Sequence, residues 1–307
     1  MIVGYRRGAG KVGLTNKEIG TRGTWAEKRR DLLQRISAAG HDIQILSPLT
    51  PPTTEALGTV SNPNAKVDLL IVEFAGLNWT FFGDEWEETI HIIKQHTGNV
   101  VFVCDDPDLP FPWAKMPDED WSRWTIATNS TQEQASRTIL KVPTPAQWVD
   151  FSMPTTPQLD FNNGLIPAAV YIGRPNSRAA MLKKFLDAPI HVAGKPKEWE
   201  EYNFHRVDAP QQSNRKQFYR RYRACLAFYD KKHEQSGWRT GRAYHALAAG
   251  IPVIAPVGNP ALNWTYTAEA TKHVKDFIAK PRQEREHIWQ QQTQTANTTT
   301  PLEAIGL

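Results

Sequence analysis

Apolar strand-like segments alternate with amphipathic helical segments along the chain, and this alternation constrains the fold more than any other feature. In the first half we expect strands at 2–5, 42–46, 67–73 and 99–104, with helices at 24–39 and 84–95 between them. In the second half the same alternation predicts strands at 168–172, 190–193, 224–229 and 251–256, and helices at 176–186, 212–222, 239–250 and 267–290. Strands that alternate with helices predict an α/β fold with parallel, doubly wound sheets.

The length of 307 residues suits two domains of roughly 150 residues each. A proline-rich segment over 141–167 is the expected linker, which places a boundary near Leu165. We therefore predict one Rossmann-like domain over 1–165 and a second over 166–280. Residues 281–307 form a final helix and tail that packs back and returns to the N-terminal domain, and the Gln/Thr-rich part at 291–300 is expected to fray.

Composition excludes several classes of protein. Apolar residues make up 40% and charged residues 22%, which supports a packed core and argues against disorder. The two cysteines, Cys104 and Cys225, form neither a disulfide framework nor a zinc motif, so a reducing cytoplasmic compartment is expected. No apolar run approaches the roughly 18 residues of a membrane span, so we expect no membrane partner. A net charge of +4 is compatible with a nucleic-acid partner but does not require one.

Two segments have the pattern of a phosphate site. In the first, a strand runs into Gly173 and then into a helix start that carries Arg174 and Arg178. In the second, Arg242 stands in the first turn of a helix that ends at Gly250 and leads into a strand. Helix starts favour anions, and arginines donate in pairs to diphosphates. A salt bridge from Arg178 to a surface carboxylate is the alternative.

Carboxylates follow the strand at 99–104, where a general base would face a ligand. Asp105 and Asp106 are nearest to the strand end. The alternatives are an Asp that caps the turn before Pro107 and a paired-carboxylate metal site, for which no third ligand lies nearby in the sequence. The histidines show no metal-binding spacing, so no residue is assigned as a metal ligand.

Basic residues cluster around a glycine-rich loop after the first strand, and they are candidates for contacts with DNA phosphates. The candidates are Arg6, Arg7, Lys11, Lys17 and Arg22. A second basic stretch over 216–232 either tracks phosphates or forms a solvated helix face.

Several short segments occur in the order and spacing of one known family. They are Asp68 to Val72 followed by Phe81-Phe82-Gly83, then Asp106-Pro107-Asp108-Leu109-Pro110-Phe111, Trp124 to Thr128, Val142-Pro143, Tyr171 to Leu186 and Arg239 to Ile254. Over about residues 1–256 the chain resembles the DNA β-glucosyltransferases of T-even bacteriophages, which glucosylate 5-hydroxymethylcytosine in DNA.

The resemblance implies the GT-B architecture, in which two Rossmann-like domains face a cleft. The N-terminal domain would bind double-stranded DNA, with Phe82 among the contacts, and the C-terminal domain would bind a UDP-sugar, with UDP-glucose as the expected donor. Asp106 matches the family's base. Arg178 and Arg242 match its diphosphate arginines, with Gly173 and Arg174 beside them, and Val207 falls where the family reads uracil. His245 replaces the family's ribose-binding Glu.

The implied reaction is an inverting displacement. Asp106 would deprotonate the hydroxymethyl group of a flipped pyrimidine, either 5-hydroxymethylcytosine or 5-hydroxymethyluracil, as it attacks the anomeric carbon. We expect a monomer in the cytoplasm of an infected bacterial host, and a divalent metal (Mg²⁺ or Mn²⁺) is left open. The alternatives are transfer to a glycan or small molecule, and a non-catalytic nucleotide- or DNA-binding protein.

Overall fold

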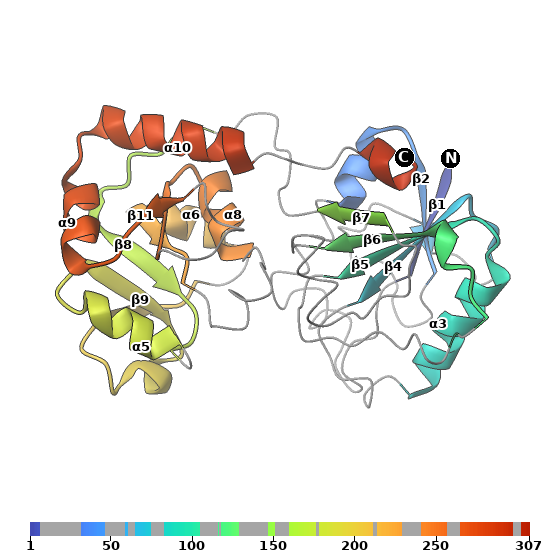
Figure 1. The fold of residues 1–307 in the computed structure, drawn as a ribbon, viewed down its shortest axis with the longest axis horizontal. Coiled ribbons are helices and arrows are strands. Elements are labelled where there is room, and N and C mark those ends of the chain that lie inside the picture. The colour runs from blue at the N-terminus through green and yellow to red at the C-terminus, as the bar shows by residue number, and fades with distance from the viewer. Residues whose placement is uncertain are drawn as a thin grey trace. The chain divides into compact units, whose positions relative to one another are not determined.

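The structure, a computed structural model, divides the chain into two compact units (Figure 1). Unit 1 comprises Met1–Phe151 and Thr300–Leu307, and unit 2 comprises Ser152–Thr299. The residues that the structure describes are 1–6, 32–46, 59–60, 65–74, 83–104, 116, 118–128, 147–150, 160–175, 178–210, 214–228, 241–256, 265–296 and 302–307.

Unit 1 is built on a seven-stranded sheet in which every described pair of neighbouring strands is parallel, in the order β3-β2-β1-β4-β5-β6-β7. The chain starts at β1, builds outward to β3, and then continues on the other side of β1 from β4 to β7. This change of direction places a topological switch point between β1 and β4. The strands are β1 Ile2–Arg6, β2 Asp42–Ile45, β3 Thr59–Val60, β4 Leu69–Phe74, β5 Asn99–Cys104, β6 Trp124–Thr128 and β7 Gln147–Asp150.

Helices cover both faces of this sheet. On one face, a helix that includes residues 32–38 buries the predicted apolar side chains of Leu32, Leu33 and Ile36 against the strands. Ile305, in the short 3-10 helix Leu302–Ile305, joins the same core, so the end of the chain belongs to unit 1. Helix α3 (Gly83–Gln95) covers the other face, where Thr89 accepts a hydrogen bond from Arg6.

Unit 2 contains a six-stranded sheet, also parallel throughout its described pairs, in the order β10-β9-β8-β11-β12-β13. Its switch point lies between β8 and β11, because the chain runs from β8 outward to β10 and then returns to β11. The strands are β8 Ile166–Ile172, β9 Ile190–Gly194, β10 His205–Asp208, β11 Tyr222–Leu226, β12 Val253–Ala255 and β13 Tyr266–Thr267.

Strand β8 contributes side chains to two hydrophobic cores, one on each face of the sheet of unit 2. This is possible because successive side chains of a strand point to opposite faces. Ala168 and Val170 pack into the core that α6, α8 and α10 complete, whereas Ala169 and Tyr171 pack into the core of α5 and α9. The helices are α5 Ala179–Leu182, α6 Arg215–Tyr219, α8 Gly241–Ala248, α9 Thr271–Ala279 and α10 Arg282–Ala296. The two doubly wound parallel sheets confirm the predicted α/β fold class.

The division between the units differs from the boundary expected near Leu165. Asn162 donates from its backbone to the carbonyl of Gly250 at 2.7 Å, and the ring of Phe161 packs 5.9 Å from that of Trp289. These contacts attach the residues before β8 to unit 2. The final segment also divides differently, since α10 packs on unit 2 and only Thr300–Leu307 belongs to unit 1.

Helix α10 corrects the prediction that the chain frays after residue 290. The buried side chain of Gln292 accepts from the backbone N–H of Val253 and donates to its carbonyl, both at 2.8 Å. The indole of Trp289 donates to the carbonyl of Leu247 at 3.1 Å. These bonds hold the helix through Ala296. The segment predicted as a helix over 267–290 is divided at Pro281, which separates α9 from α10.

Candidate functional site

Arg242, in the first turn of α8, lies at the switch point of unit 2. Its Nε donates to the carbonyl of Ile172 at 2.6 Å, and its Nη1 donates to the carbonyl of Phe228 at 2.9 Å. Ile172 ends β8, and Phe228 follows β11, so one guanidinium joins the carboxyl ends of the two strands. Ligands of open α/β sheets bind at this place.

Aromatic and polar neighbours keep Arg242 charged. Its Cζ lies 4.6 Å from the ring centroid of Tyr171, within cation–π range. Burial alone would lower the pKa of Arg242, but Tyr171, Tyr219 and Cys225 raise it above its ordinary value. The site therefore presents a fixed positive charge where an anionic ligand would lie.

Gly173 forms the turn that leads away from β8. Its φ of +150° lies outside the range that side chains favour, and a Cβ there would lie 2.8 Å from Nη2 of Arg242. Its backbone N–H donates to Ala193 at 2.9 Å, and its carbonyl accepts from the indole of Trp199 at 3.0 Å. Glycine is therefore required for this turn to approach Arg242 closely.

The other two predicted phosphate arginines follow Gly173. Arg174 is 59% exposed, and its Nε lies 3.4 Å from a carboxylate oxygen of Glu198. Exposed ion pairs of this kind contribute little to stability, so an anionic ligand could displace the carboxylate at small cost. Arg178 is half-buried just before α5, and its backbone N–H donates to the carbonyl of Pro175 at 2.8 Å.

His245 lies one turn after Arg242 on α8 and is half-buried. Nη1 of Arg215, the first residue of α6, lies 3.5 Å from Nδ1 of His245. Arg215 was not among the predicted site residues. Its contact with His245 joins residues 30 positions apart in the chain, so no local pattern in the sequence marked it.

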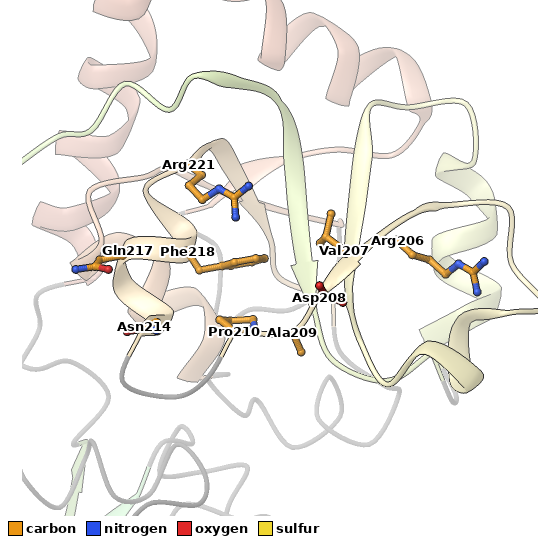
Figure 2. A pocket seen from close by; sticks show the side chains of 9 residues that line it. All are labelled: Arg206, Val207, Asp208, Ala209, Pro210, Asn214, Gln217, Phe218 and Arg221. Atoms are coloured by element: carbon orange, nitrogen blue, oxygen red, sulfur yellow. The ribbon is translucent and has the colours of Figure 1, made fainter.

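Val207 lines a pocket of about 580 Å³ between β10 and α6 (Figure 2). Phe218 and Arg221 extend from the α6 side toward β10, and the Arg221 guanidinium lies 5.8 Å from the centroid of the Phe218 ring. Ala209 and Pro210, which follow β10, lie on its lower side in this view. The pocket is lined by Arg206, Val207, Asp208, Ala209, Pro210, Asn214, Gln217, Phe218 and Arg221.

Arg6 corrects one prediction for the DNA-binding surface. Its side chain is buried, with Nε donating to Oγ1 of Thr89 at 3.1 Å and Nη1 donating to the carbonyl of Leu46 at 2.7 Å. This burial contradicts the prediction that Arg6 binds DNA phosphates. The other predicted DNA contacts and the predicted base lie outside the described residues: Arg7, Lys11, Lys17, Arg22, Phe82 and Asp106.

The residues that the structure describes contain no group of three His, Cys, Asp or Glu side chains placed to hold a metal ion. Within the same ranges, no helix has the length and apolar character needed to cross a membrane.

Comparisons with known proteins identify the architecture. No family model and no curated protein matches the sequence. The structure is similar to that of T4 phage β-glucosyltransferase in complex with UDP-glucose, with a TM-score of 0.69 and 13% identity over 100% of both chains. An α-glucosyltransferase in complex with UDP and a 13-mer DNA containing a HMU base aligns with a TM-score of 0.60 and 9% identity over 99% of this chain and 97% of that one.

A third similar structure is WaaG, a glycosyltransferase involved in lipopolysaccharide biosynthesis. It aligns with a TM-score of 0.55 and 10% identity over 99% of this chain and 97% of that one.

The chain has the GT-B fold. The GT-B expectation from the sequence is thereby confirmed, and Arg242, Gly173, Arg174, Arg178 and His245 all lie in the second of its two α/β units.

Proposed function

We propose that the chain is an inverting glycosyltransferase that moves a sugar from a UDP-sugar to the hydroxymethyl group of a modified pyrimidine in double-stranded DNA. The acceptor base would be 5-hydroxymethylcytosine or 5-hydroxymethyluracil, flipped out of the duplex because a sugar donor cannot reach a stacked base. Unit 2 would bind the donor and unit 1 the DNA.

The similarity to two glucosyltransferases over nearly the whole chain supports this proposal. One of them is bound to UDP-glucose, and the other to UDP and DNA that contains a modified base. Folds alone do not determine function, so the site must carry the argument.

The observation that carries it is the position of Arg242. A half-buried cation that bridges the carboxyl ends of β8 and β11 lies where a diphosphate would be expected in an α/β fold. Gly173 removes the side chain that would block this corner, and Arg174 and Arg178 add donors beside it. The pocket at Val207 has a size suited to a nucleobase and part of its ribose.

The proposed chemistry is one displacement. Asp106 takes the proton of the hydroxymethyl group, whose oxygen then forms a bond to the anomeric carbon of the donor sugar. The bond from that carbon to the diphosphate oxygen breaks, and the electron pair leaves with UDP. Arg178 and Arg242 stabilise the charge that develops on the leaving diphosphate.

We propose UDP-glucose as the donor and keep a divalent cation as an optional partner. T4 phage β-glucosyltransferase has been crystallised with UDP and Mn²⁺. Among the described residues there is no group of three His, Cys, Asp or Glu side chains placed to hold such a cation. We further propose that the enzyme is monomeric and acts in the cytoplasm of an infected bacterial host.

Release of UDP tests the reaction class. The chain is mixed with UDP-glucose and duplex DNA that contains either unmodified or 5-hydroxymethylated pyrimidines. UDP release that depends on the modified duplex supports the proposal, and near-normal turnover by Asp106→Ala would overturn the assignment of the base. Release that depends instead on a lipopolysaccharide-type glycan would favour the alternative acceptor, in line with the similarity to WaaG.

A further inference from the structure

Helix α6 connects the pocket at Val207 with the corner at Arg242. Asn214 and Gln217 line the pocket, whereas Arg215 reaches His245 on α8, with 3.5 Å between Nη1 and Nδ1. His245 in turn lies one turn along α8 from Arg242, which joins β8 and β11. Arg215 thus stands between the two ends of the expected nucleotide site.

The contact between Arg215 and His245 determines the state of the imidazole. Arginine has five N–H donors and no acceptor, so Nδ1 of His245 must accept in this contact. An imidazole that accepts at Nδ1 is neutral and carries its proton on Nε2. His245 is therefore a hydrogen-bond donor through its second nitrogen.

We propose that Arg215 is a positioning residue for the donor nucleotide, because it fixes His245 as an N–H donor to an oxygen of that nucleotide. The oxygen belongs to a ribose hydroxyl or to a phosphate. This inference rests on the proposed function. In this arrangement the protein donates the hydrogen bond to the nucleotide. In the family that the sequence resembles, a Glu stands at this position, and an ionised Glu can only accept.

The tautomer is tested directly in the free protein. Long-range ¹H–¹⁵N spectra of ¹⁵N-labelled protein at neutral pH, with His245 assigned through His245→Gln, report which nitrogen carries the proton. The expected result is a protonated Nε2 and an unprotonated Nδ1, with loss of this preference in Arg215→Met, whose side chain has no N–H donor. A protonated Nδ1 in the wild-type protein would overturn the inference, whether or not the protein binds a nucleotide.

Calorimetric binding of UDP tests the role in recognition. Arg215→Met, which has no N–H donor in its side chain, should weaken binding by about 5- to 30-fold, which corresponds to one hydrogen bond in the site. Arg215→Lys should recover part of the affinity because lysine also donates, and Lys216→Gln, an exposed charge on the same helix, should bind like wild type. Unchanged affinity in a folded Arg215→Met would overturn the inference alone, whereas a wild-type protein that fails to bind UDP would overturn the proposed function as well.

A second ligand identifies the oxygen. If His245 donates to a ribose hydroxyl, the loss in Arg215→Met disappears when 2′,3′-dideoxy-UDP replaces UDP. If His245 donates to a phosphate, the same loss persists with the dideoxy ligand. Both results support the inference and differ only in the group that is recognised.

Discussion

Gly173 and Arg242 meet so closely that a single methyl group on Gly173 would lie 2.8 Å from Nη2 of Arg242. The turn after β8 and the first turn of α8 are therefore fitted to one another. We predict that Gly173→Ala displaces the guanidinium and weakens UDP binding by about 10-fold or more. The unfavourable φ adds a loss of roughly 1–3 kcal/mol in the free energy of unfolding. Calorimetry and urea unfolding measure the two effects.

Gly40 offers a matched control for that variant. Its φ is +81°, but no atom lies within 4 Å of a Cβ built there. Gly40→Ala should therefore lose stability through backbone strain alone and keep the wild-type affinity for UDP. Equal affinity in both variants would contradict the fitted contact at Gly173.

Arg242→Lys tests whether the positive charge alone is enough at the switch point, or whether the forked hydrogen bonds of the guanidinium are also needed. Lysine keeps the positive charge, but it cannot donate to the carbonyls of Ile172 and Phe228 in the fork that arginine forms. We expect kcat to fall by about 100-fold, with a smaller change in KM, because the charge on the leaving group is stabilised mainly in the transition state. Steady-state kinetics measure both constants, and an unchanged kcat would remove Arg242 from the reaction.

Gln292 should be important for stability and irrelevant to the reaction. Its amide satisfies both backbone groups of Val253, so Gln292→Ala leaves two buried polar groups without a partner. We predict a loss of at least roughly 1–3 kcal/mol in the free energy of unfolding, measured in urea. Gln291→Ala, on the exposed side of the same helix, should cost almost nothing. Equal stability of the two variants would show that the pairing with Val253 is unimportant.

His191 should make the protein sensitive to acid. Burial lowers its pKa, and the neighbouring His205 and Arg221 lower it further; the His205 ring lies 4.1 Å away between centroids and that of Tyr222 lies 5.5 Å away. A histidine with a lowered pKa binds its proton more readily in the unfolded state. The free energy of unfolding should therefore fall as the pH drops through the ordinary histidine pKa of about 6.5 toward the lower value of the folded protein.

Urea unfolding of the wild type and of His191→Gln between pH 5 and pH 8 checks this prediction. The variant should lose less stability on acidification than the wild type. An identical slope in both proteins would mean that other groups cause the acid sensitivity. His96 is the natural comparison in unit 1, because burial also lowers its pKa.

The sequence predicted most of the buried strands, but it missed the buried strand β6 as well as the exposed strand β10. Strand β5 was predicted with its bounds because all but one of its residues are apolar, as in a parallel strand covered on both faces. Strand β10 was missed, because His205, Arg206 and Asp208 are exposed on an edge strand and leave no apolar pattern. The helix at 212–222 was accordingly predicted too long, since its last residue begins β11.

The prediction that Arg6 lies on a solvated DNA-binding surface rested on charge alone. A run of basic residues predicts a solvated surface, but Arg6 finds its partners at Leu46 and Thr89, which are distant in sequence. Long-range pairing also hid the contacts of Gln292 and Arg215. By contrast, the sequence placed Gly173 directly after a strand and Arg242 in the first turn of a helix, as the structure has them, because both positions follow from local patterns.

The central claim is that the chain transfers a sugar to a hydroxymethylated pyrimidine in DNA. The most direct measurement incubates the protein with UDP-sugars and duplex DNA containing 5-hydroxymethylcytosine or 5-hydroxymethyluracil, and then weighs the digested nucleosides by mass spectrometry. We predict the mass of one sugar added to one of the two modified nucleosides, with UDP-glucose as donor. Unmodified nucleoside masses with every donor, from a protein that binds UDP, would contradict the account and point to an acceptor other than DNA.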